Sequence, residues 1–254
     1  MLNLATAAPR YSNVDRQKTD GATYTPSALA KFVAEQILRV AELPARGKIR
    51  VLDPAVGDGA LLGELVKLAP LSTRNRLEVV GYDTNADAIR LAALRFKLDF
   101  PDVAIHLEQK NFLEHVLNLQ GNCDLFSAGE VPNPFHLVIA NPPYVRTQIM
   151  GASQAQQLAQ RFGLSGRVDM YYPFLLAISQ ILAVGSVVGV ITSNRFMTTK
   201  SGQSVRRELL ARFRILHAWD LGDTKLFGAA VLPSVLLARS VSYPIVDPDF
   251  RAMN

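Results

Sequence analysis

Apolar and polar residues alternate along this chain in two patterns, one typical of helices and one typical of strands. Residues 26–41 repeat apolar side chains, such as Val33 and Ile37, at intervals of three and four, which predicts an amphipathic helix. Thr25 is the expected N-cap of this helix, and Pro26 is its expected first residue. The ordered part of the chain should therefore open with a helix.

Short apolar runs and amphipathic segments then alternate. The runs expected to be strands cover residues 49–54, 77–83, 103–109, 135–144, 186–193, 214–221 and 231–239. Helices are expected over residues 59–69, 86–98, 173–183 and 201–212, with a loop or short helix over 112–133. This alternation predicts an α/β fold with a seven-stranded, mostly parallel sheet and helices on both faces. One of the last two strands should be antiparallel, because no helix separates them.

The 254 residues, 49% of them hydrophobic, suffice for one sizeable domain with a buried core. We expect an N-terminal arm over residues 1–20, the domain over 21–240, and the start of a linker or tail over 241–254. The single cysteine, Cys123, excludes an internal disulfide framework and a cysteine-based zinc site. The four histidines are scattered without metal-ligand spacing, so no metal site is expected.

Residues 171–193 contain no charged side chain and are long enough to span a bilayer. A helix that starts near Pro173, a turn at Gly185 and a buried strand explain the same run without lipid. We therefore expect no membrane segment. The N-terminus lacks the long apolar stretch of a signal peptide, which predicts a cytoplasmic protein.

The net charge of +5 is unevenly distributed. Residues 1–144 hold 15 Lys and Arg against 16 Asp and Glu, whereas residues 145–240 hold 11 against 4. A basic half attracts nucleic acid through its phosphates, but it can equally be a solvated face without a partner. Charge alone does not decide between these two interpretations.

The first chemical motif is VLDPAVGDGALL at residues 51–62, where a strand ends in Asp53 and enters a glycine turn before a helix. The spacing matches neither a dinucleotide fingerprint nor a phosphate-binding loop. Asp53 and Asp58 would repel a pyrophosphate but suit a cationic ligand such as S-adenosylmethionine. In VVGYD, Asp83 ends the next strand, where it is placed either to bind ribose hydroxyls or to cap the following helix.

The second motif is Asn-Pro-Pro-Tyr at residues 141–144, at the end of the fourth expected strand. The side-chain oxygen of Asn141 and the carbonyl of Pro142 are suited to accept the two N–H bonds of an exocyclic amine. Such acceptors free the delocalised lone pair of the nitrogen, and two consecutive prolines hold the carbonyl rigidly. Tyr144 offers a ring on which a planar base can stack. The alternative, a proline-rich strand exit, is less favoured.

Together these motifs resemble the DNA amino-methyltransferases, and within them the TaqI-like adenine-N6 enzymes with the gamma motif order. The resemblance runs from about Thr23 to Arg239 and includes the pair Asn111-Phe112. It implies the class I S-adenosylmethionine-dependent methyltransferase fold, which is Rossmann-like, with S-adenosylmethionine as cofactor. It also implies a flipped adenine in DNA as the substrate, in a restriction-modification or similar system.

The resemblance assigns a role to each site residue. The expected catalytic residues are Asn141, Pro142, Tyr144 and Phe227, the last as a second aromatic against the flipped base. The expected cofactor-binding residues are Thr25, Asp53, Pro54, Ala55, Val56, Gly57, Asp83, Asn111, Phe112 and Pro143. Among these, Thr25 would touch the methionine end of the cofactor, Asp83 its ribose, and Asn111 and Phe112 its adenine.

Two departures from the family pattern stand out. Asn111 occupies a position where the family usually has Asp, which keeps an acceptor but removes its charge. The family's separate target-recognition domain is not evident before Asn254, so a C-terminal recognition domain or a separate recognition subunit is expected.

Two other functions stay open: a methyltransferase for an RNA base or a protein glutamine, and a non-catalytic cofactor-binding subunit. The leading cofactor motif and Phe227 favour DNA.

Overall fold

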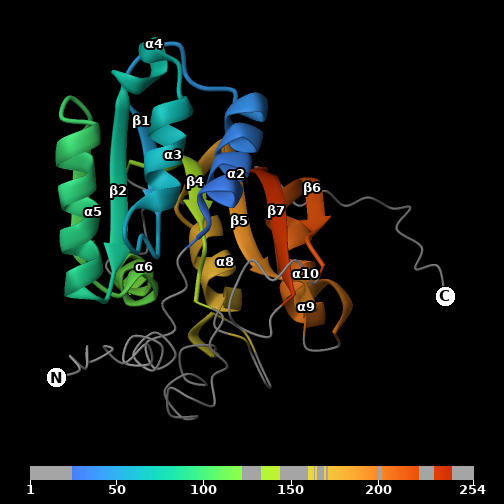
Figure 1. Ribbon diagram of the computed structural model, residues 1–254. Coiled ribbons are helices and arrows are strands. Elements are labelled where there is room, and N and C mark those ends of the chain that lie inside the picture. Colours follow the sequence, from blue (N-terminus) through green and yellow to red (C-terminus); the bar gives the residue numbers. More distant parts are fainter. Residues whose placement is uncertain are drawn as a thin grey trace, which may run out of the picture.

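The computed structural model describes residues 25–121, 133–143, 160–162, 164, 169, 171–199, 202–222 and 232–241. Seven strands form one sheet within these residues: β1 (Ile49–Asp53), β2 (Leu77–Asp83), β3 (Ala104–Gln109), β4 (Phe135–Ala140), β5 (Leu182–Ser193), β6 (Phe213–Asp220) and β7 (Pro233–Ser240). Their spatial order is β3-β2-β1-β4-β5-β7-β6 (Figure 1). In this sheet β7 runs opposite to the other six strands, which all point the same way. The predicted mostly parallel sheet with one antiparallel strand near its end is confirmed.

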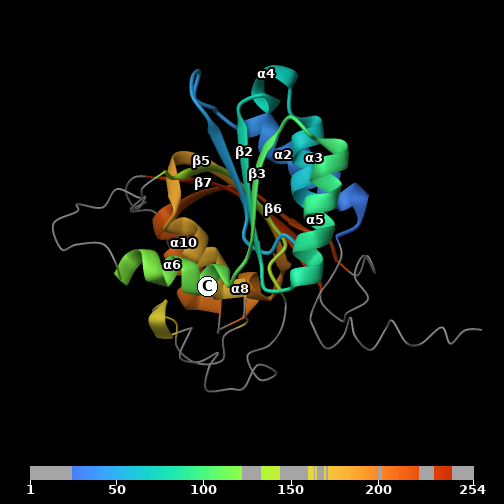
Figure 2. The same cartoon turned by 90° about the vertical axis from the view of Figure 1, so that its left-hand side faces the viewer.

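Helices cover both faces of the sheet, as predicted (Figures 1 and 2). One layer contains α2 (Ser27–Val40), α3 (Ala60–Leu68) and α5 (Ala86–Asp99). The other layer contains α6 (Phe112–Gly121), α8 (Tyr171–Ser179) and α10 (Gln203–Arg212). Two short helices, α4 (Leu71–Arg74) and α9 (Arg195–Thr198), lie in connections where the apolar pattern predicted none.

The central strands are apolar on both sides because each side faces a helical layer. In β4, Leu137 and Ile139 join the core beneath α2 and α3, whereas Val138 and Ala140 join the core beneath α6 and α8. All four side chains are fully buried. Alternation with a period of two thus builds two separate cores on one sheet, the arrangement expected of a parallel sheet covered by helices.

The uncharged run over residues 171–193 forms α8 and the long strand β5, as the second interpretation proposed. Its internal boundaries differ from the prediction. The helix begins at Tyr171, and Pro173 lies in its first turn, where a missing N–H costs nothing. Gly185 does not end the helix: it lies inside β5 with φ 83°. Across the described residues, no helix is both long and apolar enough to cross a bilayer.

The start of α2 also differs from the prediction. Pro26, and not Thr25, occupies the N-cap position, and its side chain makes no capping hydrogen bond. The carbonyl of Pro26 accepts the N–H groups of Leu29 and Ala30, each at 3.0 Å. The hydroxyl of Thr25 is therefore not used as a cap and is available for another contact.

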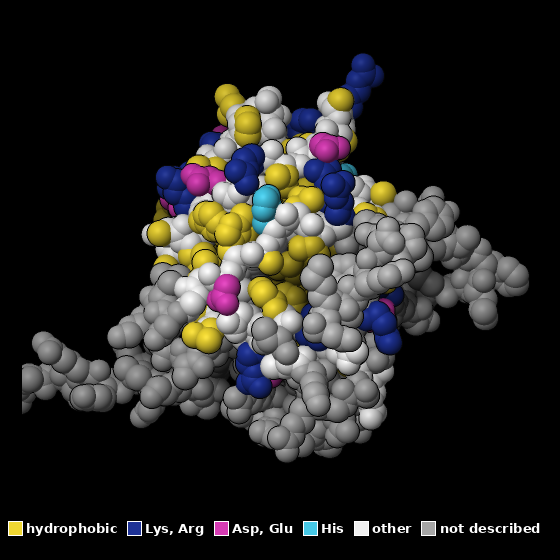
Figure 3. Space-filling view, turned by 90° about the vertical axis from the view of Figure 1, so that its right-hand side faces the viewer, with side chains coloured by type: hydrophobic (Ala, Val, Ile, Leu, Met, Phe, Trp, Pro, Cys, Tyr) yellow, Lys and Arg dark blue, Asp and Glu magenta, His cyan; other side chains and the backbone are white. Residues whose placement is uncertain are grey.

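Strand β6 lies at one edge of the sheet beside α2, and several of its side chains are exposed. Hydrophobic side chains gather on this side of the molecule (Figure 3). The Trp219 ring contacts Phe32 of α2 edge-on at 5.1 Å and stacks with His217 at 5.0 Å between ring centroids. The ring contact between Trp219 and Phe32 thus connects β6 to α2.

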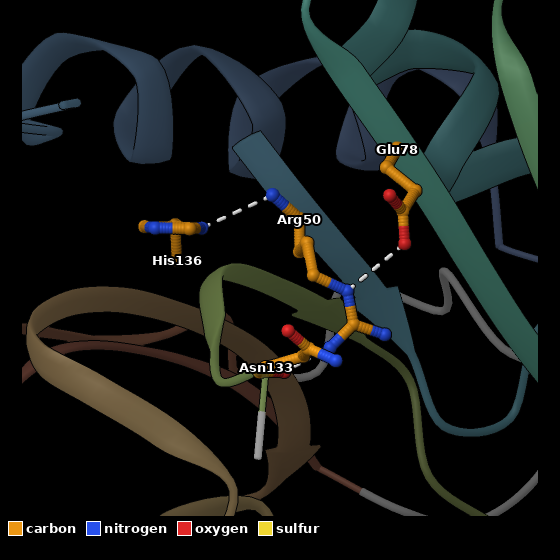
Figure 4. A network of polar contacts seen from close by, with 4 residues as sticks. All are labelled: Arg50, Glu78, Asn133 and His136. Atoms are coloured by element: carbon orange, nitrogen blue, oxygen red, sulfur yellow. Dashed lines mark hydrogen bonds and ion pairs between the residues drawn. The ribbon is translucent and has the colours of Figure 1, made fainter. Parts of the chain in front are cut away.

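The amino ends of β1, β2 and β4 form what we call the amino edge, and they meet in one polar network (Figure 4). The guanidinium of Arg50 donates to Glu78 at 3.1 Å and to the carbonyl of Asn133, and it lies 4.2 Å from the centroid of the Phe135 ring. The backbone N–H of Arg50 donates to Nδ1 of His136 at 3.0 Å. Arg50 thus joins Glu78, Asn133 and His136 through hydrogen bonds within the chain.

Candidate functional site

The opposite side of the sheet, which we call the carboxyl edge, consists of the segments that follow β1, β2, β3 and β4. The strand order reverses direction between β1 and β4, which are parallel neighbours. In parallel sheets, ligands bind where neighbouring strands lead away from each other in this way. Asp53 pairs with Gly81, and Asp83 pairs with Gln109. The predicted residues at the strand ends therefore share this edge.

The side chain of Asp53 is fully buried at the end of β1. Its Oδ1 accepts the N–H of Ala55 at 3.0 Å, whereas Oδ2 has no hydrogen-bond partner among the described residues. Burial is the main cause that raises the pKa of Asp53 to about 8; the hydrogen bond from the N–H of Ala55 lowers this pKa, and the carboxylates of Asp83 and Asp58 raise it. An orphaned acceptor in a buried position is rare, and it marks a place where a ligand group can bind.

The turn after Asp53 is shaped by two glycines. Gly57 and Gly59 have φ values of 54° and 80°, which residues with a side chain rarely adopt. A Cβ at Gly59 would lie 3.2 Å from Cβ of Ala92, so the turn also packs closely on α5. Pro54 and Val56 are buried and Ala55 is half-buried beside it. The turn leaves room for a ligand to approach the backbone.

The carboxylate of Asp58 is paired within the chain. Its Oδ2 accepts a hydrogen bond from Arg95 of α5 at 2.7 Å, and its Oδ1 accepts the N–H of Ala60 at 3.1 Å. The sequence carried no signal for this ion pair, because the two residues lie 37 positions apart. Asp53 and Asp83 remain as the candidate acidic groups for contact with a ligand.

Asp83 does not cap α5, because Asn85 does so, and contact of Asp83 with a ribose stays a prediction. Its Oδ1 accepts the N–H of Asn85, the N-cap residue of α5, at 2.8 Å. Its Oδ2 accepts the N–H of Gly57 at 2.9 Å and so joins β2 to the glycine turn. A carboxylate has about four lone-pair directions. The half-buried group therefore retains acceptor capacity for a ligand hydroxyl.

Asn111 and Phe112 lie just after β3, at the start of α6. Oδ1 of Asn111 accepts the N–H groups of Leu113 and Glu114 at 3.0 and 3.5 Å, so it caps the helix. The Phe112 ring is 1% exposed and packs between Tyr82 and Phe174. Contact of either residue with an adenine ring stays a prediction.

Asn141 follows β4, with Pro142 buried and Pro143 half-buried after it. Nδ2 of Asn141 donates to Oγ1 of Thr25 at 3.0 Å. The sequence pointed to both residues but not to the contact between them, which spans 116 positions. Tyr144 and Phe227 lie outside the described residues, so their stacking against a base stays a prediction.

Comparison with known proteins identifies clear counterparts. The profile of the family described as Eco57I restriction-modification methylase matches residues 78–227. The Type II methyltransferase M.BanIII of Aneurinibacillus aneurinilyticus is 40% identical over 225 residues, which cover 87% of this chain and 38% of that protein. The chain thus spans well under half the length of this relative.

Solved structures share the fold at low identity. One is a Listeria monocytogenes protein described as a class I S-adenosylmethionine-dependent methyltransferase, with a TM-score of 0.65 and 19% identity over 88% of this chain and 61% of that one. Another is the M protein of the Type I restriction enzyme EcoKI, with a TM-score of 0.57 and 20% identity over 87% and 45% of the two chains. The predicted class I fold is confirmed.

Proposed function

Because the chain belongs to the Eco57I restriction-modification methylase family, we propose that it transfers a methyl group from S-adenosylmethionine to the N6 amino group of adenine in DNA. The observation that carries this proposal is the position of Asn141-Pro142-Pro143 directly after β4, beside the glycine turn of β1 at the point where the strand order reverses. Two distinct chemistries, cofactor binding and amine activation, thus meet at one edge.

The residues present fit S-adenosylmethionine. The buried Oδ2 of Asp53, which has no hydrogen-bond partner in the described part of the chain, suits a cationic amino group, since a buried carboxylate is stabilised by a paired charge. The remaining lone pairs of Asp83 suit the ribose hydroxyls. The cofactor supplies an electrophilic methyl group on a sulfonium, and the chain supplies the surface that orients it.

Asn141 and Pro142 act on the target amine. Oδ1 of Asn141 and the carbonyl of Pro142 accept its two N–H bonds and draw the nitrogen toward tetrahedral geometry, which frees its lone pair for attack. Bound S-adenosylmethionine would supply the methyl group to this nitrogen and leave as S-adenosylhomocysteine, and the extra proton on nitrogen would be lost to water. This step needs no strong base, and positioned acceptors of this kind are the main catalytic contribution that the chain can make.

The finer assignments are also part of the proposal. The resemblance to TaqI-like enzymes with the gamma motif order supports adenine over other bases, with Tyr144 and Phe227 enclosing a flipped adenine. A cofactor-motif helix, α2, that precedes β1 and contacts Asn141 through Thr25 agrees with that motif order. The sequence LVIANPPY at the end of β4 supplies the remaining signature.

We propose that selection of a DNA site requires a recognition domain or a separate recognition subunit. M.BanIII and a second relative, M.PaeR7I of Pseudomonas aeruginosa, are each covered by this chain over 38% of their length. The basic residues 145–240 suit phosphate contacts, which position a protein but do not read bases. DNA binding by this chain alone should be weak and strongly salt-dependent.

Tritium transfer tests the proposed function. The chain is incubated with methyl-tritiated S-adenosylmethionine and, separately, with DNA, RNA and protein pools, and labelled DNA is digested to nucleosides. We expect label in N6-methyladenine. Label in RNA or protein alone would replace the substrate, and no label in any pool, despite measured cofactor binding, would indicate a non-catalytic cofactor-binding subunit.

A further inference from the structure

Thr25 contacts the centre of the proposed chemistry from a distant part of the chain. Its Oγ1 accepts Nδ2–H of Asn141 at 3.0 Å. We propose that Thr25 is a positioning residue for methyl transfer, and that its hydroxyl holds the Asn141 amide in the orientation that presents Oδ1 to the target amine. This inference rests on the proposed function and adds to it the residue that sets the amide orientation.

The orientation matters because the two ends of an amide have the same shape but opposite hydrogen-bonding character. With Nδ2 donating to Thr25, the oxygen of Asn141 lies on the other branch of the amide and can accept from an amine. A rotation by half a turn would present NH₂ to the target amine, so two donors would face each other and no lone pair would be freed. The threonine hydroxyl therefore favours the productive arrangement.

The packing of α2 makes this contact possible. Gly189 of β5 lies directly beneath the helix: a Cβ there would be 2.6 Å from Cδ1 of Ile37 and 2.9 Å from Cγ1 of Val33. Because glycine has no Cβ, α2 approaches the sheet closely enough to bring Thr25 to the end of β4. At the other end of the helix, the Arg239 side chain donates to the carbonyl of Val40 at 2.6 Å. Thr25 is thus presented by a helix that is anchored along its length, as a positioning group requires.

Matched substitutions separate the hydroxyl from the shape of the side chain. Thr25→Val removes the hydroxyl and keeps the volume, whereas Thr25→Ser keeps the hydroxyl. We expect Thr25→Val to lower kcat about 10-fold at saturating DNA and cofactor, the loss of one positioning hydrogen bond. Thr25→Ser should restore at least half of the wild-type kcat. The Kd for S-adenosylmethionine, measured by calorimetry, should change much less than kcat.

Thr73→Val is the control for removal of a threonine hydroxyl. Thr73 lies in α4, in the connection that leads into the amino end of β2 and so on the opposite side of the sheet from Asn141, and its replacement should leave kcat unchanged. A second background tests the mechanism itself. Asn141→Asp replaces the amide by a carboxylate, which presents an oxygen in either orientation. Adding Thr25→Val to Asn141→Asp should therefore cost much less than the same change costs the wild type.

The outcomes are distinguishable. A wild-type chain that methylates no DNA overturns the proposed function and this role with it. An active wild type with equally active Thr25→Val overturns the positioning role alone. Equal losses from Thr25→Val in the wild-type and Asn141→Asp backgrounds would also overturn it, because they would show that Thr25 acts without regard to amide orientation. A weaker Kd for the cofactor at unchanged kcat would make Thr25 a cofactor ligand only.

Discussion

The two edges of the sheet carry polar clusters of opposite character. At the amino edge, the Arg50 side chain is shared between Glu78, a backbone carbonyl and an aromatic ring. At the carboxyl edge, Asp53 is buried more deeply than any group of that network, and one of its oxygens lacks a partner among the described residues. The groups of the first cluster bond to one another, whereas the second keeps a buried acceptor that a ligand can use.

This difference separates structural from functional polar groups. A buried polar group without a partner costs free energy, so a fold retains one where a ligand supplies the missing contact. Substitutions at the amino edge should therefore change stability alone, whereas substitutions at the carboxyl edge should change ligand binding or catalysis, whether or not stability changes too. Four predictions test this division, from the largest expected effect to the smallest.

Replacement of Asn141 by Ala should lower methyl transfer by roughly 10³-fold or more, because it removes a preorganised acceptor from the reacting amine. Cofactor affinity should stay nearly intact, since no cofactor contact is assigned to this side chain. The measurement is single-turnover tritium transfer together with calorimetry. Asn75→Ala, an exposed change at the C-cap of α4, is the matched control and should behave as wild type. A variant of Asn141 that keeps most of its turnover would contradict the role.

Replacement of Asp53 by Asn should stabilise the ligand-free protein by a few kcal/mol near pH 8. The folded protein keeps the proton of Asp53 to about pH 8, whereas the unfolded carboxyl loses it near its ordinary value of 3.8. The native state therefore binds more protons between these values, and the free energy of unfolding falls as pH rises through this window. In chemical denaturation at pH 5 and pH 8, the free energy of unfolding of the variant should therefore fall less with pH than that of the wild type. The variant should also bind the cationic cofactor more weakly. Parallel pH profiles for the two proteins would refute the assignment.

Replacement of Asp83 by Ala should weaken S-adenosylmethionine binding about 10- to 100-fold, the effect of losing a charged acceptor. The change removes the acceptor proposed for the ribose and also frees the N–H of Gly57, which loosens the turn. Calorimetry on the intact chain measures it. Asp87→Ala on α5, a residue 74% exposed, supplies the control and should leave affinity unchanged. Equal affinity of both variants would remove Asp83 from the site.

Replacement of His136 by Ala should lower stability by about 1 kcal/mol and leave turnover within twofold of wild type. Burial, with Arg50 and Arg76 nearby, lowers the pKa of His136, so the folded state favours the neutral ring that accepts from Arg50. This contribution is present above the unfolded pKa of 6.5 and is lost as pH falls through the lower folded pKa. The stability gap between wild type and variant should therefore narrow at acidic pH in chemical denaturation. A clear loss of turnover would contradict the separation of the two edges.

Most of the fold could be predicted because each strand is a short apolar run between polar turns. The expected strand over residues 77–83 and the expected helix over 86–98 match β2 and α5 to within one residue. The run over 171–193 gave the right elements but the wrong boundaries, because a continuous apolar sequence has no polar residue to mark where a helix stops. The short helix α4 was not predicted, for the opposite reason: it buries no residue, so its sequence shows no periodic apolar pattern.

The site could be predicted as a set of residues but not as a set of contacts. Asp53, Asp83 and Asn141 each follow an apolar strand, so parallel pairing alone brings them to one edge. Three contacts could not be foreseen: the ion pair of Asp58 with Arg95, the turn that Asp83 closes, and the hydrogen bond from Asn141 to Thr25. Each joins segments whose distance depends on how closely helices pack on the sheet, which periodicity does not encode.

The position of α2 has a consequence for how this chain folds during synthesis. The helix is made early, yet it packs over β5 and its last turn is held by Arg239, 199 positions later. Contacts between segments so far apart form slowly, because closing the long loop between them costs conformational entropy before the contacts can stabilise the structure. On the ribosome, the part of the apolar face of α2 that packs on β5 stays uncovered until β5 has emerged. Apolar surface exposed in this way favours aggregation while the intervening residues are being made.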